Sequence, residues 1–146
     1  MKFRKLKGYK YILEADERFT LKVNLPSSFW TEWVCPVRNY FYYSADGTLS
    51  IRAGYAWDGA SGPTIDTKTT YHGSLLHDLL YQLMREGIIP RSYRKAADQE
   101  LRDVCIEHGM YPIRAKLWYL AVRTFGGKQA LPRKNPRGQI IDTEAL

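Results

Sequence analysis

SLLHDLLYQL, residues 74–83, places a histidine and an aspartate in the middle of a leucine-rich stretch. At about 100° per residue, one face of the predicted helix consists of five leucines, Leu75, Leu76, Leu79, Leu80 and Leu83. Asp78 falls on the opposite face together with Ser74, Tyr81 and Arg85, and His77 falls at the seam. An imidazole at such a seam can be covered on one side and face a cleft on the other, which suits a general base.

Helical periodicity extends over the whole second half of the chain. Three helices are predicted, each with a start signal and a glycine after its end: Thr69 or Thr70 to Glu86 before Gly87, Ser92 to His108 before Gly109, and Pro112 to Phe125 before Gly126. Apolar residues nearly encircle the third segment, so we expect it to be the most buried helix.

The first 60 residues instead alternate in the manner of strands. Two runs, 9–14 and 19–25, flank Ala15–Arg18 and predict a hairpin. A second hairpin is predicted over residues 39–57, where Asp46–Gly47 supplies the positive-φ turn. The expected fold class is α+β, with an N-terminal, mostly antiparallel β-sheet followed by a three-helix C-terminal half. A chain of 146 residues favours a single domain, here residues 1–130, with 131–146 an extended basic tail.

The net charge of +7 is compatible with an anionic partner, but basic ends often only aid solubility. No base-reading helix or aromatic RNA-binding signature accompanies the charge, so we do not expect nucleic-acid binding. The sequence has no segment that predicts a transmembrane helix or a signal peptide. Cys35 and Cys105 lack metal-type spacing and are expected to be free thiols. We therefore expect the protein in the cytoplasm of its host cell.

A loop rich in Gly, Ser, Asp and Pro, residues 57–69, lies between the two halves. Asp58 and Ser61 in this loop are candidate binding residues, whereas Asp66 is expected to satisfy its own backbone. Asp98 lies at the edge of the apolar face of the second helix and can reach His77 from a neighbouring antiparallel helix. The alternative is that Asp98 forms ordinary solvated pairs with Arg94 and Arg102, four residues away on either side.

Four motifs in order resemble a phage and prophage family catalogued only as a domain of unknown function. They are GYAWDGASGP (54–63), LLHDLLY (75–81), RKAADQEL (94–101) and LWYLAVRTFGG (117–127). The resemblance covers about residues 50–127 and implies a phage or prophage origin without implying an activity.

A second, local resemblance is to the paired helices of sn-2 phospholipases, which carry an H-D-x-x-Y motif on one helix and an aspartate on an antiparallel one. By this resemblance His77 would be the base, Asp98 would orient it and Tyr81 would brace Asp98. Asp78, with carbonyls of the loop from Gly59 to Gly62, would hold Ca²⁺. The chain departs from those enzymes in having two cysteines and a β-rich first half.

Two classes of function follow from these residues. The first is a metal-assisted hydrolase of lipid or other ester bonds, acting on a lipid or cell-envelope substrate. The second is a virion or assembly component that binds phage structural proteins, in which the polar cluster is purely structural.

Overall fold

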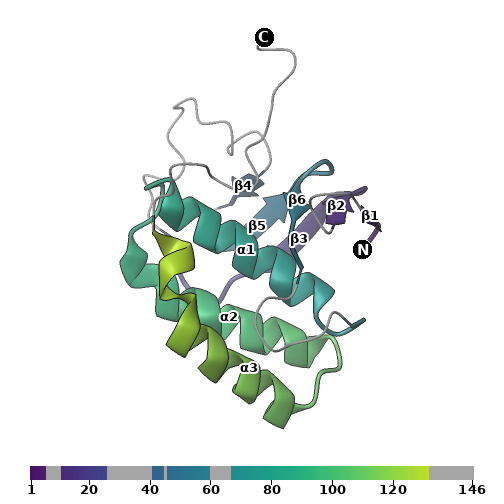
Figure 1. The fold of residues 1–146 in the computed structure, drawn as a ribbon. Helices are drawn as coiled ribbons and strands as arrows, with labels where there is room; N and C mark the ends of the chain where they lie inside the picture. The colour runs from purple at the N-terminus through teal and green to yellow at the C-terminus, as the bar shows by residue number, and fades with distance from the viewer. Residues whose placement is uncertain (6–10, 26–40, 45, 60–66, 132–146) are drawn as a thin grey trace. The chain divides into compact units, whose positions relative to one another are not determined.

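The structure is a computed structural model that describes residues 1–5, 11–25, 41–44, 46–59 and 67–131 (Figure 1). The chain divides into two compact units, with the strands up to Ala56 in the first and the helices from Trp57 onward in the second. The predicted α+β class is confirmed, because antiparallel strands precede three helices. Compact units need not be separate folding domains, so one domain over residues 1–130 stays a prediction, as does the tail, of which only Leu131 is described.

The strands form two three-stranded sheets, ordered β1-β2-β6 and β3-β5-β4. Their bounds are β1 Phe3–Lys5, β2 Tyr11–Leu13, β3 Glu17–Thr20, β4 Phe41–Tyr43, β5 Thr48–Ile51 and β6 Ala56–Trp57. The predicted turn at Asp46–Gly47 joins β4 to β5, and Gly47 has the positive φ of 88° that such a turn requires. The hairpin predicted over residues 39–57 is therefore confirmed for β4 and β5, but its second strand ends at Ile51, and Ala56–Trp57 form β6 in the other sheet.

The first predicted hairpin is wrong. β2 pairs with β1, Phe3 opposite Leu13, whereas β3 pairs with β5 in the other sheet. Phe19 lies opposite Leu49 in that second pairing, and both side chains are buried. Cross-strand burial of this kind decides which strands pair, and it outweighs closeness in sequence.

The helical unit contains α1 Tyr71–Arg85, α2 Arg94–Glu107 and α3 Pro112–Phe125, with short 3-10 helices η3 Arg91–Tyr93 and η4 Gly126–Ala130. Gly87 and Gly109 follow α1 and α2 with φ of 72° and 96°, which confirms both predicted stops. Pro112 opens α3 as expected. The second helix begins at Arg94 rather than at Ser92, because residues 91–93 form the tighter turn of η3.

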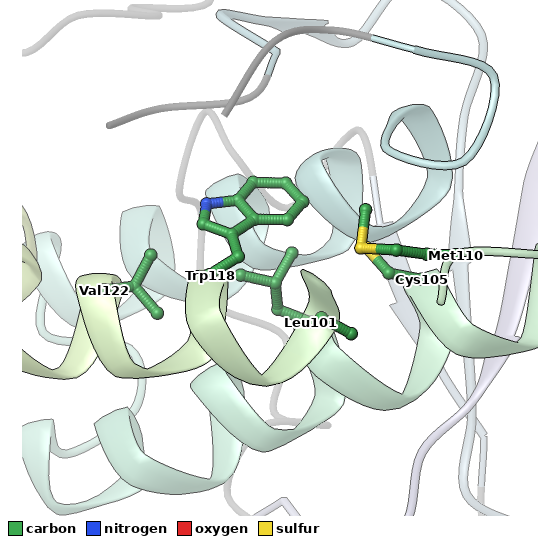
Figure 2. Close-up of a cluster of buried hydrophobic side chains, with 6 residues drawn as sticks. Leu101, Cys105, Met110, Trp118 and Val122 are labelled. Atoms are coloured by element: carbon green, nitrogen blue, oxygen red, sulfur yellow. The ribbon is translucent and has the colours of Figure 1, made fainter. Parts of the chain in front are cut away.

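Packing of α2 against α3 forms one apolar core of the helical unit (Figure 2). Its six buried members are Leu101, Cys105, Met110, Ala115, Trp118 and Val122. Helix α1 approaches α2 closely at Gly73, where an added Cβ would lie 2.5 Å from Sγ of Cys105. A glycine at this position therefore permits the contact between the two helices.

The expectation that α3 is the most buried helix is wrong. Only Ala115, Trp118 and Val122 of its 14 residues are buried, whereas 11 of the 15 residues of α1 are buried. When apolar residues surround a whole helix, their pattern does not indicate which side packs against another helix, and α3 packs on one side only. Among the described residues, no helix is long and apolar enough to cross a membrane.

Candidate functional site

His77 on α1 and Asp98 on α2 form the centre of a buried polar cluster in the helical unit. Nε2 of His77 lies 2.7 Å from Oδ1 of Asp98, so the contact expected between these two helices is present. Asp98 is 0% exposed and His77 is 5% exposed. A carboxylate is almost never buried so completely without partners, so its other contacts decide what the pair can do.

Asp98 accepts two further hydrogen bonds. The Tyr81 hydroxyl donates to Oδ1 over 2.6 Å, and Nη1 of Arg123 donates to Oδ2 over 2.9 Å. Burial on its own would raise the pKa of Asp98, but the hydrogen bond and charge of His77, followed by the bonds from Tyr81 and Arg123, hold that pKa below its usual value of 3.8. Asp98 is therefore an ionised carboxylate inside the unit.

The ionised state of Asp98 fixes the tautomer of His77. A carboxylate can only accept a hydrogen bond, so the short contact requires that Nε2 of His77 carries the proton. In the neutral imidazole Nδ1 then holds the lone pair, and among the described residues no hydrogen bond is formed to Nδ1. The imidazole is thus oriented as a proton acceptor at Nδ1.

Tyr81 is held in turn by Arg94. Nε of Arg94 donates to the Tyr81 hydroxyl over 3.2 Å, and its Nη2 donates to the carbonyls of Val122 and Arg123 over 2.8 and 2.7 Å. Burial and then the hydrogen bond to Asp98 raise the pKa of Tyr81 well above its usual value, so its hydroxyl keeps the proton that it donates. A cation at the carbonyl end of α3 also interacts favourably with the helix dipole.

Gly126 lies directly against this pair. A Cβ added there would be 3.2 Å from the Tyr81 hydroxyl and 3.6 Å from Nη2 of Arg94. The segment from Val122 to Gly126 therefore contributes Arg123, two backbone carbonyls and a site of close approach. Arg94 and Arg123 are residues that sequence reasoning missed as site residues; their presence inside the RKAADQEL and LWYLAVRTFGG motifs was the available signal.

The alternative prediction for Asp98, that it pairs with Arg94 and Arg102 in solvent, is wrong. Arg102 lies 3.0 Å from Asp103, its neighbour, and Arg94 contacts Tyr81 instead. The cause is burial: Asp98 faces α1 and α3, where His77 and Arg123 supply donors.

The helix face opposite the leucines of α1 is also largely buried. Ser74 and Tyr81 are 1% and 2% exposed, and Ser74 accepts a hydrogen bond from Nε1 of Trp57 over 3.1 Å. Asp78 and Arg85 are the partly exposed members of this face, and Oδ2 of Asp78 accepts a hydrogen bond from the backbone N–H of Asp58 over 3.2 Å. Asp78 therefore lies at the start of the glycine-rich loop.

Two residues of the expected cation site, Asp78 and Gly59, lie within the described residues. Asp78 offers hard carboxylate oxygens of the kind that Ca²⁺ prefers, and Asp58, which donates to it, is followed in the sequence by Gly59, which is buried and has φ of 81°. Gly62 and Ser61, like Asp66 and Cys35, lie outside the described residues. Within the described ranges no three His, Cys, Asp or Glu side chains gather as metal ligands.

The two other histidines of the chain lie apart from this cluster as a pair. The rings of His72 and His108 stack with centroids 3.7 Å apart and an interplanar angle of 4°. Cys105 is a free, buried thiol, and burial raises its pKa to about 12, so it is not a nucleophile at neutral pH.

A family described as protein of unknown function, DUF1353, matches residues 36–122. The chain belongs to this family. The match covers His77, Tyr81 and Asp98, and it ends one residue before Arg123. DUF1353 membership confirms that the chain contains a domain of unknown function, with bounds that begin earlier and end earlier than the motifs indicated. No match was found among curated proteins or among solved structures.

Proposed function

We propose that this chain is a hydrolase of ester bonds in which His77 is the general base and Asp98 orients it. The observation that carries the proposal is the 2.7 Å contact between Nε2 of His77 and the buried, ionised Asp98. It leaves Nδ1 as the proton acceptor and provides a fixed negative charge that stabilises the imidazolium formed during a reaction.

The proposed reaction is direct attack of water. Nδ1 of His77 takes one proton from a water molecule while the water oxygen bonds to the ester carbonyl carbon. The carbon–oxygen bond to the alcohol then breaks, and the proton on Nδ1 passes to the departing alkoxide. The products are a carboxylic acid and an alcohol, and His77 returns to its starting state.

Asp78 is the proposed cation ligand, together with carbonyls of the Gly59–Gly62 loop. A bound Ca²⁺ would stabilise negative charge that develops on the carbonyl oxygen of the substrate. The support for this role is the hydrogen bond that the backbone N–H of Asp58 donates to Oδ2 of Asp78, where the loop begins.

The proposed substrate class is a phospholipid or another ester of the cell envelope, and the proposed origin is a phage or prophage. Both rest on motif resemblance: H-D-x-x-Y with an aspartate on a second helix for the substrate, and the four ordered motifs for the origin. The protein would act in the cytoplasm of a bacterial host or within a virion.

The experiment is an assay of the full chain on a soluble short-chain ester and on dispersed phospholipid, with calcium or with a calcium chelator. We expect hydrolysis by the natural protein, a strong loss in His77→Gln and Asp98→Asn, and calcium dependence that disappears in Asp78→Asn. The matched control is His72→Gln, which removes a histidine from the same helix outside the cluster. Hydrolysis that is unchanged in His77→Gln would contradict the proposal.

A second candidate is a virion or assembly component that binds phage structural proteins, and the burial of the cluster favours it. His77, Tyr81 and Asp98 are each at most 5% exposed, and Arg123 joins them to the third helix. Such a network can lock three helices into one arrangement without any chemistry. An inactive natural protein that is strongly destabilised by His77→Gln would favour this candidate over the hydrolase.

A further inference from the structure

Helix α3 presents a stripe of large apolar side chains away from its packed side. Ile113, Leu117 and Leu120 are 77%, 62% and 47% exposed, and their spacing of four and three residues places them on one face of the helix. Trp118 and Val122 occupy the buried side. We call the three exposed residues the α3 outer stripe.

Two exposed aromatic side chains flank the stripe. Tyr111 precedes the helix and is 82% exposed, and Phe125 ends it and is 79% exposed. Single exposed apolar residues are ordinary, but the three of the stripe share one helix face, and five large ones occur within 15 consecutive residues, a density that marks an interaction surface.

The charged residues of the segment that carries the stripe all have one sign. From Tyr111 to Lys128 the sequence contains Arg114, Lys116, Arg123 and Lys128 and no aspartate or glutamate. Lys116 and Lys128 are exposed, whereas Arg123 is bound to Asp98. An apolar stripe on a helix with basic neighbours is the pattern of helices that lie in the interface of an anionic membrane.

We propose that the α3 outer stripe docks onto an anionic lipid surface. A second copy of the chain fits less well, because a symmetric contact would gather Lys116, Lys128 and the same two lysines of the second copy at one interface, without an acidic residue between Tyr111 and Lys128 to pair with them. Lipid tails accept exposed aliphatic and aromatic side chains, and anionic headgroups attract the lysines. Docking would bring a lipid ester to the unit that holds His77, and this consequence rests on the proposed function. The docking itself does not rest on it.

The test is flotation of the full chain with vesicles of phosphatidylglycerol and phosphatidylethanolamine, compared with vesicles of phosphatidylcholine. We expect binding to the anionic vesicles and at least a tenfold weaker binding to the neutral ones. The double variant Leu117→Asn, Leu120→Asn should lose at least nine-tenths of the binding while its circular dichroism stays unchanged. His77→Gln should bind as the natural protein does, which separates docking from hydrolysis.

Charge-matched variants distinguish docking from general attraction. Lys116→Glu, beside the stripe, should weaken binding several-fold more than Lys95→Glu, an exposed lysine on α2. Equal losses in these two variants, or binding that survives the double leucine variant, would overturn the proposal. So would absence of vesicle binding, or a dimer that becomes a monomer in the double variant, because the stripe would then serve a protein partner or a second copy.

Discussion

His77 and His72 lie five residues apart on the same helix and have opposite environments. His77 contacts the carboxylate of Asp98, whereas the ring of His72 stacks on the ring of His108. Burial and then the neighbouring His108 lower the pKa of His72 to about 4, so it is uncharged at neutral pH. One histidine therefore has a fixed anion to support an imidazolium, and the other is in surroundings that oppose a positive charge. The partner, rather than the residue type or its helix, separates a candidate base from a packing residue.

The largest expected effect is on catalysis and separates the two histidines. His77→Gln should lower the rate of ester hydrolysis about 10²–10⁴-fold, because proton transfer by a positioned base contributes that much. His72→Gln should leave the rate within about twofold, since no proposed step uses it. Initial rates on a soluble ester measure both. Equal losses of rate in His77→Gln and His72→Gln would contradict the different roles of the two histidines.

The next largest expected effect is on stability, and it tests the role of the Asp98 carboxylate. Asp98→Ala should lower the free energy of unfolding by about 3–5 kcal/mol, because it leaves His77, Tyr81 and Arg123 without their buried acceptor. Urea denaturation gives the value. Asp103→Ala on the same helix, where the partner is the half-buried Arg102, should cost less than about 1 kcal/mol. A cost for Asp98→Ala no larger than that of the control would contradict the network.

The stacked pair of His72 and His108 should make the free energy of unfolding depend on pH. Below pH 6.5 the unfolded chain protonates His72, whereas the folded chain does not until about pH 4, so the unfolded state binds more protons in this window. The free energy of unfolding should therefore fall as the pH falls from 6.5 to 4, and His72→Gln should flatten that slope. Asp98, whose pKa is lowered from 3.8, adds a further loss only below that range. Denaturation at a series of pH values measures the slope; one that is unchanged in His72→Gln would show that the stack is not its source.

The smallest expected effect is on stability and concerns the hydrogen bond from Tyr81 to Asp98. Tyr81→Phe removes one of its donors and the acceptor of Arg94, and should cost about 1–3 kcal/mol of unfolding free energy. Tyr111→Phe, at an 82% exposed position, should change stability by less than about 0.5 kcal/mol. Thermal or urea unfolding of the two variants provides the comparison. Equal stability of both would place the Tyr81 hydroxyl outside the energetics of the network.

Local signals in the sequence were sufficient for much of the fold. Gly47, Gly87 and Gly109 each require a positive φ, and Pro112 suits a first helical turn, so the hairpin turn, two helix stops and one helix start were predictable. The pairing of β3 with β5 was not, because it depends on burial between residues about 30 positions apart, such as Phe19 and Leu49.

The same limit applies to the candidate site. Helical spacing and the short connection between two helices predicted that Asp98 can reach His77. Nothing in the local pattern indicated that Arg123, 25 residues after Asp98, would donate a hydrogen bond to the Asp98 carboxylate. Nor did the pattern indicate that Tyr81 would be buried. The side on which α3 packs decides both, and a helix with apolar residues around its circumference does not reveal that side.

Asp98 holds His77 as a proton acceptor at Nδ1. The most direct measurement is the ¹⁵N spectrum of the histidine rings at a pH where the His77 ring is neutral, with the His77 signals assigned by their loss in His77→Gln. The structure predicts a proton on Nε2 and an unprotonated Nδ1. A neutral ring that carries its proton on Nδ1 would contradict this role of Asp98, because Nε2 could not then donate to its carboxylate.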